Sequence, residues 1–300
     1  MRNTFIKKLL EAAVTNEKIV LIVGDLGYSV VEDFEKKFPE RFYNAGISEQ
    51  NMASMAAGLA SEGFHVFIYS IANFPTFRCA EQLRNDVGYH NLAVTVVAVG
   101  GGLSYGNLGY SHHAVQDFGL MRLFPEFEIL SPGDPLETEM CLDYVLRNPG
   151  PSYLRLKKAG EPNYNSNVKI LQPGIWNEVI ASKNNRILLT TSGGLHIAQQ
   201  LKNVNIDFSN YGIYTCPIWG AKFKELQQNQ IDIFDEVVTV EDHLLDCGFG
   251  SWIRESITKP DTHLKIINKA LSQNVIGKVG SEEYLLMLGG FELKKKPIKN

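Results

Sequence analysis

Unbroken apolar runs alternate with amphipathic stretches along the chain, and this pattern limits the possible folds more than any other feature. Five apolar runs predict strands at 18–24, 65–70, 92–99, 124–132 and 151–156. Helical patterns occupy the stretches before and between them, at 3–15, 48–62, 75–90, 114–122 and 135–147. Strands that are apolar at every position are typical of a parallel sheet covered on both faces. The alternation therefore predicts an open α/β sheet.

A polar segment with Gly, Pro and Asn begins at residue 158 and interrupts this series. Beyond it, further strands are predicted within 186–194, 211–214, 236–240 and 264–267. With 300 residues, and a typical domain of roughly 150, the chain suits two domains. We expect an α/β protein made of two open α/β sheet domains, 1–165 and 181–300, joined by a linker at 166–180.

Composition and charge exclude several classes of protein. The net charge of -4 lacks the basic excess of a dedicated nucleic-acid binder. No apolar run approaches the roughly 18 residues of a membrane span, and the N-terminal segment lacks the apolar core of a signal peptide. The four cysteines are far apart, without metal or redox spacing, and are interpreted as reduced thiols. We expect a cytoplasmic protein with no nucleic-acid or membrane partner.

The segments after the strands hold the candidate site residues, because ligands of open α/β sheets bind at the carboxyl ends of the strands. Asp25 and Ser29 lie on a glycine-flanked turn after the first strand; as an alternative, either side chain caps a helix. Ser48 is expected to start a helix of small apolar residues, with Glu49 in its first turn. There Glu49 either holds and delivers a proton in partly desolvated surroundings or only complements the helix dipole.

Aromatic and histidine side chains follow the next two strands. Phe74 and Phe77 are three residues apart and either line one face of a turn or pack into the core. The third strand leads into a glycine-rich loop that ends at two adjacent histidines, His112 and His113. Glycine allows a ligand to approach the backbone, and histidines suit substrate contacts or proton transfer; the alternative is a pair of surface histidines. Their spacing is not a metal-binding pattern, so we predict no metal-ligating residue.

The same loop contains a formal Gly-x-Ser-x-Gly string centred on Ser104. A nucleophile elbow needs a sharp turn from strand to helix, whereas the following Asn107, Leu108 and Gly109 are a poor helix start. We interpret the string as a chance match and keep a serine hydrolase only as a minor alternative. The glycine motifs of dinucleotide and P-loop sites are absent from the sequence.

Taken in this order, the segments resemble the transketolase family of thiamine diphosphate enzymes, and more narrowly the C-terminal subunit of a split transketolase. The segments that carry the resemblance are 25–26, 46–52, 74–78, 111–113, 120–134, 240–243 and 248–251. The resemblance spans nearly the whole chain. It implies a pyrimidine-binding domain followed by the family's C-terminal domain, and the transfer of a two-carbon ketol unit from a ketose to an aldose.

The resemblance also implies cofactor-binding and catalytic residues. Glu49 corresponds to the glutamate that bonds N1′ of the cofactor's aminopyrimidine, which favours the imino tautomer whose nitrogen removes the thiazolium C2 proton. Phe74 and Phe77 correspond to the aromatic wall of the pyrimidine, and Asp25 and Leu26 to residues that line the cofactor. The cofactor supplies the carbanion chemistry, and the protein controls orientation and protonation.

Substrate contacts are implied as well. His112 corresponds to a catalytic histidine that contacts the substrate carbonyl or hydroxyls, with His113 beside it. Arg2 and Ser29 fall where the family contacts a sugar phosphate. Lys158, or its neighbour Lys157, stands where a substrate-binding arginine is expected.

A Gly-Asp-Gly motif, which holds the diphosphate through Mg²⁺ in this family, is absent from the sequence. The resemblance then implies that a separate N-terminal subunit carries the diphosphate and Mg²⁺ site. The active site would lie at an interface, most simply in a heterotetramer with two subunits of each kind (α2β2). The chain alone is then expected to be inactive.

Three positions depart from the family's pattern. Leu108 replaces an acidic residue, and Gly100 or a neighbour replaces a histidine at the end of the third strand. Lysine replaces the expected arginine at 157 or 158 and lacks the planar fork that grips phosphate. These changes motivate the hypothesis of a modified or nucleotide-linked sugar as substrate. The remaining alternatives are the β subunit of a 2-oxo acid dehydrogenase or decarboxylase and a non-catalytic pseudo-subunit.

Overall fold

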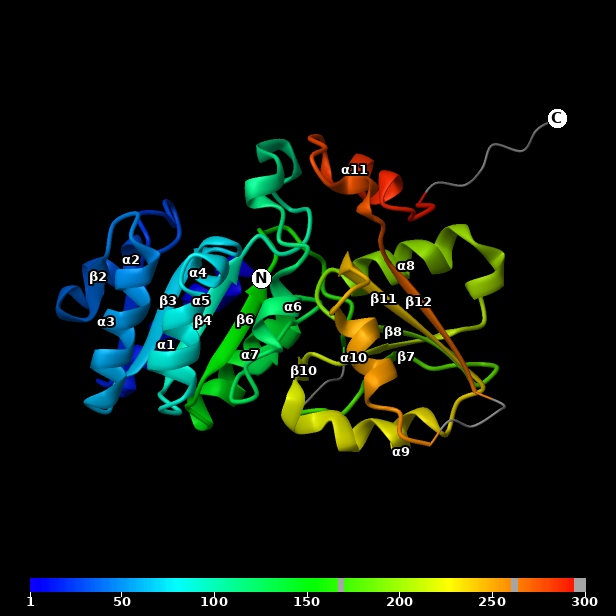
Figure 1. Ribbon diagram of the computed structural model, residues 1–300, viewed down its shortest axis with the longest axis horizontal. Coiled ribbons are helices and arrows are strands. Elements are labelled where there is room, and N and C mark those ends of the chain that lie inside the picture. The colour runs from blue at the N-terminus through cyan, green and yellow to red at the C-terminus, as the bar shows by residue number, and fades with distance from the viewer. Residues whose placement is uncertain (167–169, 260–263, 294–300) are drawn as a thin grey trace.

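The computed structural model describes residues 1–166, 170–259 and 264–293, which form two layered α/β halves side by side (Figure 1). The first half, coloured blue to green, is built on a seven-stranded sheet with the order β10-β5-β6-β4-β3-β1-β2. The second half, coloured yellow-green to red, is built on a five-stranded sheet with the order β12-β11-β8-β9-β7. Most neighbouring strands are parallel, so the predicted α/β fold is confirmed.

Six strands of the first sheet come from residues 19–156. They are β1 Ile19–Val23, β2 Phe42–Asn44, β3 His65–Ile71, β4 Val94–Val99, β5 Glu128–Leu130 and β6 Ser152–Leu156. Every residue of β1, β4 and β6 is buried, as expected where helices cover both faces of a sheet. The sequence does not predict β2, because its three partly or fully exposed residues at the sheet edge form no apolar run.

Alternate residues of β1 face two different helical layers. Ile19, Leu21 and Val23 belong to a core with α1 (Arg2–Thr15), α2 (Glu32–Lys37) and α7 (Pro135–Arg147). Val20 and Ile22 belong to a core with α3 (Glu49–Ser61) and α6 (Asp117–Met121) on the other face. This period of two is the geometry of a strand buried on both faces.

The prediction of one helix over 75–90 is wrong. The segment forms three short pieces: α4 Phe74–Phe77, α5 Ala80–Gln82 and the π-helical turn η2 Leu83–Gly88. Cys79 separates the first two with a non-helical backbone, φ −125° and ψ 27°. The break leaves the aromatic pair on a single turn directly after β3.

The second half has its own strands and helices. Its sheet comprises β7 Asn177–Ile180, β8 Arg186–Thr190, β9 Gly212–Thr215, β11 Glu236–Leu244 and β12 Lys265–Leu271. Its helices are α8 Gly194–Val204, α9 Gln227–Ile231, α10 Phe249–Glu255 and α11 Glu282–Leu288. The short 3-10 turns among the described residues are η1 Pro39–Arg41, η3 Gly106–Leu108, η4 Tyr110–His112, η5 Ile206–Phe208, η6 Ala221–Leu226 and η7 Gln273–Val275.

The predicted linker at 166–180 is more than a connection. Its last residues form β7, which pairs antiparallel with β9, while residues 167–169 lie outside the described residues. In addition, β10 (Ile218–Trp219) comes from the second half of the chain and pairs antiparallel with β5 of the first sheet. The halves therefore share a strand, and the division into domains at 1–165 and 181–300 stays a prediction.

A fully buried arginine, Arg155 of β6, also joins the two halves. Its Nε donates to Asp117 Oδ2 at 2.7 Å, and its Nη1 donates to Asp242 Oδ1 of β11 at 2.7 Å and to Ser192 Oγ at 2.7 Å. Burial alone raises the pKa of Asp242, but the nearby Arg155 and Lys157 outweigh it and hold the pKa below its usual range. The carboxylate therefore stays ionised and paired inside the protein.

Arg155→Ala is expected to lower the free energy of unfolding by about 3–5 kcal/mol, because Asp117 and Asp242 stay buried without their cation. Urea unfolding followed by tryptophan fluorescence measures the loss. The matched control is Arg147→Ala: Arg147 is exposed at the end of α7 and donates to the Asp143 carbonyl of its own helix, so its loss should stay within about 0.5 kcal/mol. A loss of less than about 1 kcal/mol for the Arg155 variant would contradict this role.

A second buried group between the halves is the carboxyl of Glu137 in α7. Its Oε2 accepts from the Gly133 amide at 2.7 Å, and its Oε1 accepts from Thr215 Oγ1 of β9 at 2.5 Å. Burial and the neighbouring Asp134 carboxylate raise the pKa of Glu137 to about 7. In an unfolded chain the pKa of a glutamate is about 4.3.

The raised pKa of Glu137 predicts a loss of stability with rising pH. Between about pH 4.3 and 7, the unfolded chain is ionised at this position while the folded chain keeps the proton, so the free energy of unfolding falls. Glu137→Gln cannot ionise and is expected to flatten this part of the profile. Urea unfolding of both proteins between about pH 4.5 and 8 measures the two slopes, and equal slopes would show that the assignment is wrong.

Candidate active site

Glu49 is a buried carboxylate beside an open hollow. It is the first residue of α3, as predicted, and only 4% of it is exposed. Its Oε1 accepts a hydrogen bond from Arg78 Nη1 at 2.9 Å, which forms an ion pair between the start of α3 and the turn after β3. A hollow of about 550 Å³ opens beside this pair and is lined by Ile47, Ser48, Glu49, Gln50, Asn51 and Arg78.

Arg78 links Glu49 to the aromatic pair. Its guanidinium carbon Cζ lies 3.9 Å from the centroid of the Phe74 ring. Phe74 is half-buried, whereas 47% of Phe77 is exposed, so the core-packing alternative is wrong for Phe77. The sequence predicts no role for Arg78, because its place in the motif does not indicate that its side chain reaches Glu49.

His112 packs against Phe74 of the aromatic pair. The rings of His112 and Phe74 are 5.2 Å apart at 70°, an edge-to-face contact. Burial lowers the pKa of His112, and the neighbouring His113 and Arg78 lower it further. The ring is therefore neutral at pH 7. It is connected to Glu49 through Phe74 and Arg78.

His113 is buried inside the loop, with 2% of it exposed and its Nε2 3.2 Å from the Gly106 carbonyl oxygen. The Asn73 side-chain amide donates to the His113 carbonyl at 2.9 Å and to the Ser111 carbonyl at 3.2 Å. These bonds fix the loop to the turn that carries the aromatic pair. The structure thus gives His113 a part in holding the loop, whereas its predicted substrate contact gains no support from this placement.

Lys158 and Arg2 lie at the other end of these contacts. Lys158 Nζ is 4.6 Å from the centroid of the Tyr105 ring, and the Tyr105 and His112 rings are 6.3 Å apart. Burial raises the pKa of the Tyr105 phenol, while the nearby Arg2 guanidinium partly offsets the rise. We call the connected residues the contact row; its members are Glu49, Arg78, Phe74, His112, Tyr105 and Lys158.

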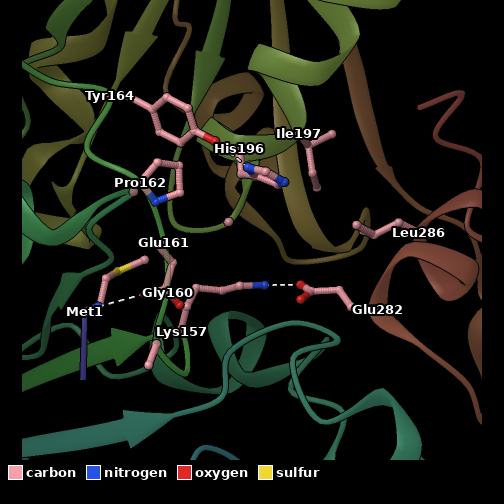
Figure 2. A pocket seen from close by; sticks show the side chains of 13 residues that line it. Met1, Lys157, Gly160, Glu161, Pro162, Tyr164, His196, Ile197, Glu282 and Leu286 are labelled. Atoms are coloured by element: carbon pink, nitrogen blue, oxygen red, sulfur yellow. Dashed lines mark hydrogen bonds and ion pairs between the residues drawn. The ribbon is translucent and has the colours of Figure 1, made fainter. Parts of the chain in front are cut away.

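Lys157, although adjacent to Lys158, belongs to a different place. Its ammonium group pairs with Glu282 of α11 and lies 3.7 Å from Asp242 Oδ2. Figure 2 shows this pair beside a cavity of about 200 Å³ between the two halves, with the Tyr164 hydroxyl bonded to His196 on the other side. The four side chains form two pairs, Lys157 with Glu282 and Tyr164 with His196, and each pair joins the segment after β6 to the second half.

Asp25 and Leu26 lie outside the contact row, on the turn after β1. They line a separate hollow of about 120 Å³. Asp25 Oδ1 accepts from Asn44 Nδ2 at 3.1 Å, and Asn44 Oδ1 accepts from the Gly46 amide at 2.9 Å. This chain of bonds joins the turn that carries Asp25 to the segment that leads into α3.

Two serines singled out in the sequence have local partners. The Ser29 amide donates to Glu32 Oε1 at 2.5 Å, at the start of α2. Ser104 Oγ donates to the Gly101 carbonyl at 2.8 Å, and a single 3-10 turn follows it. The strand-to-helix turn of a nucleophile elbow is therefore missing at Ser104, and the serine hydrolase alternative loses its basis.

The described part of the chain contains no candidate metal-binding cluster, and its four cysteines are free thiols. Among these residues, no group of three or more His, Cys, Asp or Glu side chains could hold a metal ion. Cys79, Cys141 and Cys216 are buried free thiols, and Cys247 is an exposed one. Within the same residues, no helix combines the length and the apolar character needed to cross a membrane.

Comparison with protein families decides what kind of protein carries this site. Residues 1–162, more than half of the chain, match the family described as transketolase, pyrimidine binding domain. The chain belongs to the transketolase family. The matched residues include α1 to β6 and every member of the contact row, so the resemblance noted in the sequence is confirmed.

Relatives carry the transketolase name over nearly the whole length of this chain. A transketolase C-terminal section of Methanocaldococcus jannaschii is 32% identical over 296 residues, which are 97% of this chain and 92% of that protein. One subunit of an apulose-4-phosphate transketolase of Actinobacillus succinogenes is 26% identical over 288 residues, 94% of this chain and 91% of the relative.

A solved structure has the same fold. It is described as a split gene transketolase, inactive beta4 tetramer, and has a TM-score of 0.81 at 27% identity, covering 97% of this chain and 93% of that one. The chain thus covers more than 90% of the length of each of these three proteins. These names favour a transketolase subunit, a transferase, over the 2-oxo acid alternative.

Arg78→Ala is expected to destabilise the chain by about 1 kcal/mol, because Glu49 loses its cation and stays buried. The value is small because Arg78 itself is 46% exposed and water screens the pair. Arg84→Ala is the matched control, since Arg84 is exposed and bonds Asn85 instead. Thermal unfolding of the three proteins measures the effect; an Arg78 variant as stable as the wild type would mean that the pair contributes nothing.

Proposed function

We propose that the chain is one subunit of a thiamine diphosphate-dependent transketolase that transfers a two-carbon ketol unit from a ketose to an aldose. The observation that supports this most is the buried Glu49 carboxylate, which faces a hollow of about 550 Å³ at the carboxyl end of a parallel sheet. Ligands of open α/β sheets bind at this edge. Family membership, and relatives named as transketolase subunits, support the same reaction class.

The residues around this hollow suit the aminopyrimidine of the cofactor. A planar heterocycle packs on an aromatic face, and Phe77 offers a ring that is 47% exposed, with Phe74 three residues earlier. A protonated ring nitrogen needs an acceptor, and Glu49 offers a carboxylate. When bound, thiamine diphosphate supplies the carbanion chemistry. In this proposal Glu49 holds the proton at the pyrimidine nitrogen, and Asp25 and Leu26 line the cofactor.

His112, Arg2 and Lys158 are proposed to bind the sugar. The lowered pKa of His112 leaves a neutral ring at pH 7, which can donate one hydrogen bond and accept another at a hydroxyl or carbonyl oxygen. Arg2 and Lys158 bring positive charge to the Tyr105 end of the contact row, which suits a phosphate group. A modified or nucleotide-linked sugar stays part of the proposal, because the exposed Leu108 stands where the resemblance implies an acidic residue.

The diphosphate and Mg²⁺ are proposed to be held by a separate N-terminal subunit, most simply in an α2β2 assembly in the cytoplasm. Exposed apolar side chains lie in β2 and on the segments that follow β1, β2 and β3, which suits a surface covered by a partner. They are Tyr28, Tyr43, Ile47 and Phe77. The names of two similar proteins, a transketolase subunit and an inactive beta4 tetramer, fit an enzyme that needs a second kind of subunit.

In the complex with the N-terminal subunit, Glu49→Gln is expected to lower kcat by about 10²–10⁴-fold, because an amide cannot hold a proton as a carboxylate does. The assay follows ketol transfer to an aldose phosphate from each member of a panel of ketose phosphates. Glu62→Gln is the matched control, since Glu62 is exposed just after the same helix, and it should keep wild-type activity. Near-normal turnover of the Glu49 variant would remove the basis of the proposal.

A further inference from the structure

Tyr105 fills the space that a side chain at the end of β4 would otherwise occupy. Gly100 follows β4 directly, and its φ of +84° favours glycine. A Cβ atom placed on Gly100 would lie 2.0 Å from Tyr105 Cε2 and 2.2 Å from Cδ2. Both distances are far below van der Waals contact, so the glycine and the tyrosine form a matched pair. The Tyr105 ring therefore occupies the space that a side chain at Gly100, directly after β4, would need.

Residues from three distant segments meet around this ring. Lys158, which follows β6, places its Nζ 4.6 Å from the ring centroid. His112, in η4, places its ring 6.3 Å away at 67°. Arg2, in the first turn of α1, lies close enough to influence the phenol, and its buried Nε has no hydrogen-bond partner among the described residues. Tyr105 therefore lies beside three of the residues proposed to bind the sugar.

This position gives the side chain two effects on a bound sugar. The rigid ring lies 6.3 Å from the His112 ring, which is proposed to meet the substrate carbonyl, and 4.6 Å from Lys158 Nζ, which is proposed to meet the phosphate. It therefore limits the length of chain that can lie between them. The hydroxyl stays protonated at neutral pH, because burial raises the pKa of the phenol, and it offers a donor to a phosphate or hydroxyl oxygen.

We propose that Tyr105 is a specificity-determining residue of the sugar site. Its ring sets the space between His112 and the cations Arg2 and Lys158, and it favours shorter phosphorylated ketoses over longer ones. The inference rests on the proposed function and adds to it the class of substrate that the site selects.

The test compares two donors of different length in the complex with the N-terminal subunit. The donors are D-xylulose 5-phosphate and D-sedoheptulose 7-phosphate. Tyr105→Ala is expected to raise the ratio of kcat/KM for the longer donor to that for the shorter donor by about tenfold or more, because removal of the ring opens space beside His112 and Lys158. Tyr105→Leu, which keeps apolar bulk in the loop, should shift the ratio in the same direction and covers the case of an alanine variant that fails to fold.

Two further variants separate the ring from its hydroxyl and from the loop. Tyr105→Phe keeps the ring, so it should leave the ratio unchanged while it raises KM for both donors. Tyr110→Ala is the matched control, because Tyr110 lies on the same loop with its hydroxyl 2.8 Å from Gln116 Oε1; its ratio should equal that of the wild type.

Equal losses for both donors in Tyr105→Ala and Tyr105→Leu, with a ratio within about twofold of the wild type, would overturn the proposal and leave Tyr105 a purely structural residue. A wild-type complex that neither binds nor turns over any ketose donor, modified and nucleotide-linked sugars included, gives a different result. It would contradict the proposed function itself, and the specificity role with it.

Discussion

The buried guanidinium of Arg155 is the interaction on which the rest of the structure depends. Removing an arginine from water is costly unless its donors find acceptors and its charge finds a partner. Here the donors bond side chains at the start of α6 and in the second half of the chain, and two backbone carbonyls. The acceptors are the side chains of Asp117, Ser192 and Asp242 and the carbonyls of Ala114 and Asp242. One cation thereby fixes both sheets and the end of the glycine-rich loop.

The glycine-rich loop connects Arg155 to the candidate site, because its base includes Ala114, whose carbonyl accepts a hydrogen bond from Arg155. Gly102 and Ala114 exchange two backbone hydrogen bonds of 2.9 Å, which close the loop at its base. A Cβ atom on Gly102 would lie 2.2 Å from Asp242 Oδ2, so the loop passes this buried carboxylate only with glycine there. The closed loop presents Tyr105 and His112 from one rigid base. Catalytic geometry depends on such support, since a site that is loose by about 1 Å loses much of its activity.

The sequence predicts the structure correctly where a local hydrophobic pattern has one physical interpretation. The apolar runs of β1, β3 and β4 predict buried parallel strands, and the carboxyl ends of those strands share an edge, so Glu49, the aromatic pair and His112 could be placed together. The sequence does not predict side-chain contacts between residues that are distant along the chain. Arg155 lies within an apolar strand, and its acidic partners are 38 and 87 residues away in the sequence.

Two further features could not be predicted from the sequence: a very short strand, and a pair of residues in which one side chain fills the space left by a glycine. β10 has two residues, too few for any period, and it crosses from one half of the chain to the other sheet. From the sequence, Gly100 or a neighbour is interpreted only as the replacement of a histidine expected at the end of the third strand. Only the fold shows that the Tyr105 ring takes that space.

The central claim is that this chain supplies the pyrimidine half of a cofactor site that a second subunit completes. Calorimetric titration with thiamine diphosphate and Mg²⁺ tests it most directly, first on the chain alone and then on its complex with the N-terminal subunit. We expect saturable binding to the complex and none to the chain alone. Tight binding to the chain alone, or no binding to the complex, would contradict the claim.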